Sequence, residues 1–215
     1  QKLSSDDIDQ LIAETKKLQE LQLAPDSPEA LSTLPSLEIE DVPKEIEKYP
    51  LEIKHHGDTK ILFHELFTND IAYIQIGFNS HSVPTEMISY LPLLGTLVMG
   101  MGTGKHNYAE ISKLMGMHTG GIRTSHFSSA TVQDRHQVLS YTIFSGKALM
   151  EKVDSLFDIF DELLGNYKFD DHKRLVEIIR SAKSDMEDSI VPQGNHYVLA
   201  RLQSYQSRLG QFEEL

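Results

Sequence analysis

The order of the secondary-structure patterns constrains the fold of this chain most, because strand patterns come first and helix patterns come last. "LEIKHHGDTKILFHELF" has two β-rich runs around a "HGD" turn, and "IAYIQIGFN" alternates as a third strand would. "GGIRTSHFSSATV" and "HQVLSYTIFSG" predict a long antiparallel pair with polar residues between them. Three helical patterns follow, over about 149–164, 170–189 and 194–209. This order predicts an α+β fold, with helices packed on a mainly antiparallel sheet.

The first fifty residues differ from the rest in pattern. Residues 4–23 predict a helix that Ser4 or Ser5 caps, and its apolar residues fall on one face. These residues are Ile8, Leu11, Ile12, Leu18 and Leu21. The acidic stretch that follows is broken by prolines, and a helix with an apolar face indicates a segment that packs on something. We therefore expect a helical connector between domains over residues 1–45 and an α/β domain over residues 46–215.

Composition excludes several classes of function. The formal net charge is −12 and basic residues run together only in pairs, so we expect no nucleic-acid partner. The chain has no cysteine, which excludes disulfides and thiolate metal sites. No apolar run approaches 18 residues, so we expect no membrane span. The chain starts at Gln1 without a secretory pattern, and its first methionine is Met87; we expect a piece of a longer protein.

A glycine-rich stretch follows an apolar helical pattern over 84–99. Gly100, Gly102, Gly104 and Lys105 resemble a phosphate-binding loop, but Met99 stands where that motif needs its first glycine. His106 replaces its hydroxyl residue, and the loop follows a helix rather than a strand. We predict instead a helix C-terminus closed by glycines that tolerate positive φ. A nucleotide site over the Gly100–Lys105 loop stays an alternative.

Metal and catalytic patterns are also incomplete. His64-Glu65 does not continue into H-E-x-x-H. His106 and Glu110 are spaced i,i+4, but Asn107 with Glu110 equally predicts the start of a helix over 107–117. Ser125 lies next to His126 without a G-x-S-x-G elbow. The residues alone therefore predict no catalytic residue and no metal site, which favours a binding or structural module over an enzyme.

Several segments in this order resemble a known family. They are "LPSLEIEDVPKEIEKYPLEI", "ILFHELFTNDIAYIQIGF", "YLPLLGTLVMGMGT", "TGGI" and "GNHYVLARL". Together they resemble the third quarter of the presequence-protease branch of the pitrilysin/insulinase zinc metallopeptidases. The resemblance implies a connector followed by the first domain of the enzyme's C-terminal half, within four related α/β domains that close around a peptide chamber. It also implies a bacterial cytoplasm or an organelle matrix as the compartment.

The family's zinc motif, H-x-x-E-H, belongs to the N-terminal domain, and this chain resembles a degenerate copy of that domain. Aligning the glycine-rich turns puts the motif positions on Leu93, Thr96 and Leu97, none of which suits zinc. The resemblance thus implies that the chain alone is inactive and that zinc belongs to the full-length parent. It implies as partners the N-terminal catalytic half, the fourth domain of the same polypeptide and a peptide substrate. A standalone interaction domain of the same fold, without protease activity, stays an alternative.

One strand matches the position of the family's substrate-edge strand. It gives Gly121, Ile122, Arg123, Thr124 and Ser125 as a possible peptide-binding edge, against the alternative of an ordinary sheet strand. The family's substrate-engaging arginine and tyrosine belong to the fourth domain. For Tyr197 and Arg201 we therefore expect only packing or hydrogen bonding within the helical layer.

Overall fold

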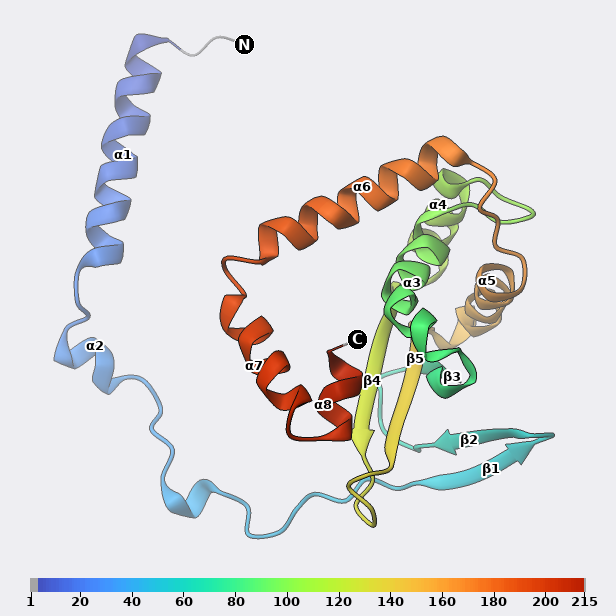
Figure 1. Ribbon diagram of the computed structural model, residues 1–215. Helices are drawn as coiled ribbons and strands as arrows, with labels where there is room; N and C mark the ends of the chain where they lie inside the picture. Colours follow the sequence, from blue (N-terminus) through green and yellow to red (C-terminus); the bar gives the residue numbers. More distant parts are fainter. Residues whose placement is uncertain (1–3, 215) are drawn as a thin grey trace. The chain divides into compact units, whose positions relative to one another are not determined.

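The computed structural model describes residues 4–214 and divides the chain into two compact units, Gln1–Leu66 and Phe67–Leu215 (Figure 1). The connector and domain that we expect over 1–45 and 46–215 stay a prediction. The α+β class is confirmed, because helices pack on an antiparallel sheet in the second unit. Within residues 4–214, no helix combines the length and the apolar character needed to cross a bilayer.

The first unit contains the predicted helix and hairpin, with a short second helix between them. α1 (Ser5–Leu23) begins at the cap Ser4, whose hydroxyl accepts from the Asp7 amide at 3.2 Å while Asp7 accepts from the Ser4 amide. α2 spans Pro28–Ser32, and β1 (Glu52–His56) pairs with β2 (Thr59–Phe63). Gly57 takes φ +56 in the hairpin turn, a conformation that glycine adopts without strain. The apolar residues predicted to share one face of α1 are all exposed.

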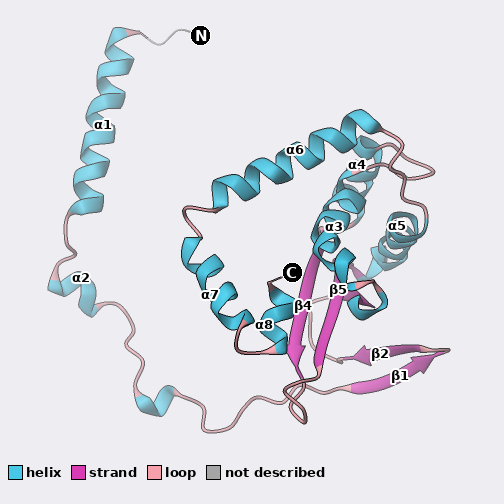
Figure 2. Ribbon diagram, viewed as in Figure 1, coloured by secondary structure: helices cyan, strands magenta, loops and turns pink. Residues whose placement is uncertain are grey.

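The second unit is built on three antiparallel strands in the order β3-β5-β4. Figure 2 shows β4 and β5 side by side. β3 spans Ile71–Asn79, β4 spans Ile122–Ala130 and β5 spans Val138–Leu149. The register aligns Ile76 and Thr124 on either side of Phe144, so these three residues share one face of the sheet. The prediction that Leu149 begins a helix is wrong: it pairs with Ile71 as the last residue of β5.

Three helices cover the face of the sheet that carries Phe144: α3 (Leu91–Gly100), α4 (Tyr108–His118) and α5 (Val153–Gly165). A 3₁₀ turn over Thr85–Tyr90 precedes α3, and Pro92 sits in the first turn of α3, so the predicted helix over 84–99 is two elements. α5 lies directly on β5: a Cβ on Gly146 would be 2.8 Å from Leu156 Cδ1 and from Phe160 Cζ. Leu156 and Leu163 of α5 are fully buried and form the centre of the core.

α6 (His172–Ser189) packs against α3. Ile178 of α6 lies in one apolar cluster with Leu97 and Met101. The third helix predicted over 194–209 is wrong in its extent, since the chain forms α7 (Gly194–Ser204) and α8 (Arg208–Glu213). The two helices meet closely, because a Cβ on Gly210 of α8 would lie 2.3 Å from the Gln203 carbonyl oxygen of α7. Ser207 then caps α8 through the Gly210 amide at 3.0 Å.

Tyr197 and Arg201 both make polar contacts within the helical layer, as expected. The Tyr197 hydroxyl lies 2.7 Å from Ser189 Oγ, which links α7 to the end of α6. The Arg201 guanidinium forms an ion pair with Glu214 at 2.7 Å. Both side chains therefore hold the helical layer together.

Candidate functional site

The glycine-rich loop between α3 and α4 uses its backbone amides internally. The Thr103 amide donates to the His106 carbonyl at 2.8 Å, and the Gly104 amide donates to the Asn166 carbonyl at 2.7 Å. The amides of Lys105 and His106 both donate to Thr103 Oγ1, at 3.3 and 3.0 Å. A phosphate-binding loop needs such amides free to point at the ligand, so this arrangement counts against a nucleotide site.

None of the glycines of this loop has positive φ, so that part of the prediction is wrong, and two of them, Gly100 and Gly102, are closely packed instead. Only Gly57 and Gly121 have positive φ among the glycines of the described chain. A Cβ on Gly100 would lie 2.9 Å from Ile178 Cδ1, and one on Gly102 would lie 2.9 Å from the His106 carbonyl oxygen. The end of α3 at Gly100 is as predicted, but the tight contacts are those of Gly100 with α6 and of Gly102 with the loop backbone.

A buried carboxylate fastens the same loop to α5. The Glu162 side chain is 8% exposed; it accepts from the Thr103 hydroxyl, and its Oε1 lies 2.8 Å from His106 Nδ1. Burial on its own raises the pKa of Glu162, but the bonds from Thr103 and His106 and the nearby positive charges of His106 and Lys105 together hold it below its usual value. Glu162 is therefore ionised at neutral pH, and this network attaches the loop to α5.

Sequence reasoning missed this pair, because His106 and Glu162 are 56 residues apart and lie in no shared motif. Glu110, which the sequence offered as a metal partner for His106, instead accepts from the Asn107 amide at 2.9 Å. This capping of α4 by Asn107 and Glu110 confirms the predicted helix start. His106 thus pairs across the fold rather than along its own helix.

The residues aligned with the zinc motif lie together on α3. Leu97 is buried and Leu93 is partly buried, and both pack in the cluster of Met101 and Ile178. The Thr96 hydroxyl donates to the Pro92 carbonyl of its own helix at 3.0 Å. Two alkyl side chains and one hydroxyl bonded to its own helix do not suit zinc, which binds imidazole, carboxylate or thiolate.

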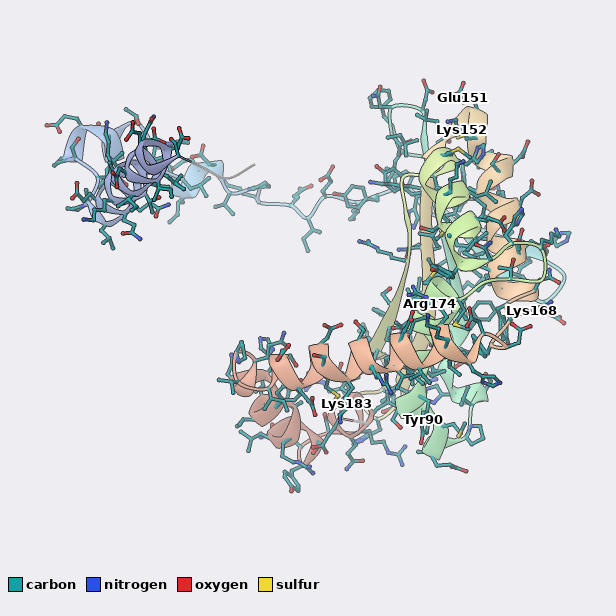
Figure 3. The ribbon with its side chains drawn as sticks, turned by 90° about the horizontal axis from the view of Figure 1, so that it is seen from above. Tyr90, Glu151, Lys152, Lys168, Arg174 and Lys183 are labelled. Carbon is teal, nitrogen blue, oxygen red and sulfur yellow. The ribbon has the colours of Figure 1, made fainter. Side chains whose placement is uncertain are left out.

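An arginine of α6 lies at the C-terminus of α3. Within residues 4–214, no three histidine, aspartate or glutamate side chains lie close enough together to hold a metal ion. Beside α3, Arg174 of α6 (Figure 3) donates from Nε to the Gly100 carbonyl at 3.1 Å, and its guanidinium stacks over the Tyr108 ring at 4.5 Å. Arg174 therefore caps the C-terminus of α3, where a cation stabilises the helix dipole.

The predicted peptide-edge residues lie at the start of β4. Gly121 has φ +104 and leads into the strand, in which Ile122 and Thr124 face the helices while Arg123 and Ser125 are exposed on the opposite face. β4 pairs with β5 on one side only, which makes it an edge strand. Within the described part of the chain, no backbone hydrogen bond reaches residues 122–130 from an element other than β5. The structure thus brings two exposed polar side chains together at a strand edge without backbone pairing, while α8 lies against the far end of β4, where the Ser128 hydroxyl donates to Glu213 at 2.8 Å.

Comparison with known proteins relates this arrangement to peptidases. The chain is 31% identical over 207 residues to protein HypA of Clostridium perfringens, which covers 96% of the chain and 21% of that protein. It is 31% identical over 212 residues to presequence protease 1, chloroplastic/mitochondrial, of Arabidopsis thaliana, covering 99% of the chain and 20% of that protein. The mitochondrial presequence protease of Xenopus laevis is 26% identical over 191 residues, covering 87% of the chain and 18% of that protein. The chain spans about a fifth of the length of these relatives.

The α+β unit, whose apolar helix α3 packs in the core, together with these relatives defines the class as a region of peptidase-related polypeptides. Within that class, the chain belongs to the family described as associated with peptidases of family M16, subfamily C, whose model matches residues 1–215. The presequence-protease branch given by the sequence resemblance is thereby confirmed.

Proposed function

We propose that the chain is part of a zinc metalloendopeptidase that degrades peptides. In that enzyme it forms the connector between the two halves and a non-catalytic domain of the C-terminal half. The observation that carries this proposal is the continuous similarity over 212 residues to a fifth of a presequence protease. Residues 1–45 link the two halves, and residues 46–215 form part of the wall of the substrate chamber. Zinc belongs to the N-terminal catalytic half, which with the fourth domain of the same polypeptide is the partner of this chain.

The architecture of the second unit supports the role of a wall. Helices α3, α4 and α5 cover one face of the sheet, whereas Tyr73, Arg123 and Phe127 are exposed on the other face. A sheet with one covered and one exposed face suits a chamber lining, since the exposed face is free to meet a peptide. The apolar packing of Leu93 and Leu97 supports a structural function for α3 in place of metal binding.

The peptide contact that we propose for this wall is strand addition at β4, over Gly121, Ile122, Arg123, Thr124 and Ser125. An edge strand presents unpaired amides and carbonyls, and an extended peptide satisfies them by adding one more strand. Amide shifts in a labelled chain test this contact directly: an unstructured peptide should shift residues 120–131 and leave β3, the other edge strand, unshifted. Shifts confined to β3, or none, would contradict it.

The proposed position of residues 46–215 in the wall of the substrate chamber is tested in the full-length polypeptide. A substrate peptide with a photoreactive side chain should crosslink to residues 121–129 of this segment when a protease-dead variant of the catalytic half is used. Crosslinks found only in other parts of the polypeptide would contradict the proposal that this segment forms part of the chamber wall. A reading frame that lacks H-x-x-E-H upstream of this segment would favour the standalone interaction domain instead.

A further inference from the structure

The outward-facing side chains of β4 form a row that changes character along the strand. Arg123, Ser125 and Phe127 alternate with residues that face the helices, so they lie on the open face two residues apart. The register aligns Arg123 with Ser145 and Phe127 with Tyr141 of β5. One end of the row is therefore cationic and the other end is aromatic, and the two ends lie four positions apart in the sequence.

The cationic end is unusual for this chain, whose net charge is −12. β3, β4 and β5 contain no aspartate or glutamate, and their open face carries two cations, Arg123 and Lys147. Within residues 4–214, no carboxylate oxygen lies within 4.0 Å of either cation. The positive charge at this point of the sheet is thus left for a partner outside the described chain.

The second cation leans toward the same corner of the sheet edge. Lys147 follows Gly146, the partner of Ile122, and its carbonyl accepts from the Gly120 amide at 2.7 Å, so that neither Gly120 nor Gly121 presents a side chain against it. The Lys147 stem lies over Gly120, where an added Cβ would be 2.9 Å from Lys147 Cε. The two glycines therefore let the lysine reach toward the edge beside Arg123.

The aromatic end offers apolar surface at the same edge. Phe127 is 47% exposed, and Leu139, which precedes Tyr141 by two residues on the same face of β5, is 37% exposed. An apolar side chain placed beside Phe127 would bury part of this surface. Cross-strand pairs of this kind, and pairs of opposite charge, are what specify the partner of a strand.

We propose that the β4 edge selects extended peptides in which an apolar residue precedes a carboxylate by four positions. This proposal rests on the strand addition proposed above and specifies which peptides it favours. The sheet is antiparallel throughout, so a peptide that continues it runs opposite to β4 and meets Phe127 before Arg123. The carboxylate then accepts from the Arg123 guanidinium, with Lys147 nearby, while the residue between the two faces Ser125.

Three labelled twelve-residue peptides of neutral Ser, Thr and Gln test the proposal by fluorescence anisotropy at low salt. The first has Phe at position 4 and Glu at position 8; the second has the same composition with Glu at position 7; the third has Lys at position 8. A spacing of three puts the two side chains on opposite faces of a strand. We expect the first peptide to bind about threefold more tightly than the second and about tenfold more tightly than the third.

Two variants of the chain assign the effect to its residues. Arg123→Gln should remove the preference for Glu over Lys, while Arg180→Gln, which removes an exposed cation on α6, should leave it intact. Phe127→Ser should weaken binding of all three peptides about threefold, since each carries Phe at position 4. Circular dichroism checks that each variant keeps the fold.

The possible results separate this proposal from strand addition itself. Equal affinities for the three peptides, with shifts of the β4 amides, would leave strand addition standing and overturn the selectivity. Absence of binding by all three would overturn both. A preference for Glu that survives in Arg123→Gln would also overturn the proposal, because Arg123 would then not be the group that recognises the carboxylate.

Discussion

Replacing Glu162 with alanine tests the attachment of the glycine-rich loop to α5. The substitution removes a side chain that is 8% exposed and leaves the Thr103 hydroxyl and the His106 ring without their shared acceptor. Those two groups position the loop between α3 and α4, because Thr103 also receives the amides of Lys105 and His106. The variant should therefore lose stability rather than any chemical step.

The magnitude follows from the bonds that are lost. A hydrogen bond to a charged group contributes about 1.5–3 kcal/mol, and two of them end on Glu162. Removing the carboxylate also removes its own burial cost, so we expect a net loss of about 2–3 kcal/mol in the free energy of unfolding. With a urea dependence of about 2 kcal/mol/M, the midpoint should fall by about 1–1.5 M. Far-UV circular dichroism is the assay, because the chain has no tryptophan for fluorescence.

Asp161→Ala is the matched control, since Asp161 is the preceding acidic residue of α5 and is exposed. This change should alter the free energy of unfolding by less than about 0.5 kcal/mol. If Glu162→Ala and Asp161→Ala lost equal stability, the bonds to Glu162 would not be what stabilises the loop.

The pH dependence gives a second test of the same carboxylate. The pKa of Glu162 in the folded chain is held below its ordinary value of 4.5. Its contribution to stability is therefore fully present above the unfolded pKa and is lost as the pH falls through the lower folded pKa. The stability difference between the wild-type chain and Glu162→Gln should be constant above about pH 5.5 and should narrow below about pH 4.5. A difference that grows on acidification would refute this reasoning.

Three further predictions use the same urea assay or a titration. Gly121→Ala should lower the free energy of unfolding by about 1–3 kcal/mol, because Gly121 has φ +104. Gly116 lies inside α4, where an added Cβ meets nothing within 4 Å, so Gly116→Ala should raise it by about 0.5–1 kcal/mol. Equal effects would show that backbone conformation does not determine the cost of replacing these glycines. Leu163→Ala should cost about 2–5 kcal/mol, since Leu163 is fully buried, and a loss below about 1 kcal/mol would contradict its place in the core. Calorimetric titration with magnesium ATP should give no binding heat, and saturable binding that Lys105→Ala removes would restore the nucleotide site.

Local patterns were enough to predict most elements of the fold. Alternating side chains over residues 71–79 predicted a strand, and the structure has β3 there. A polar run over residues 122–130 also predicted a strand, which is β4. Asn107 and Glu110 predicted the start of α4 because capping involves residues only three apart. These successes share one property, which is that the deciding interactions lie close together in the sequence.

The prediction errors arise where contacts between residues distant in the sequence determine the local structure. At the break between α7 and α8, Gly210 lies against Gln203, and a helical pattern over 194–209 gives no sign of it. Gly100 and Gly102 were explained by positive φ, but they are closely packed against Ile178 and against the loop backbone. For the candidate site, sequence predicted the segment 121–125 but not the cation Lys147, which only the register of β5 brings beside it.

Peptide cleavage tests most directly whether this chain is a non-catalytic part of a zinc peptidase. The full-length polypeptide and this chain alone are each incubated with an unstructured quenched-fluorescence peptide, with and without a zinc chelator. We expect cleavage by the full-length polypeptide that the chelator abolishes, and none by the chain alone. Chelator-sensitive cleavage by the chain alone, or cleavage by the full-length polypeptide that ignores the chelator, would contradict the proposed function.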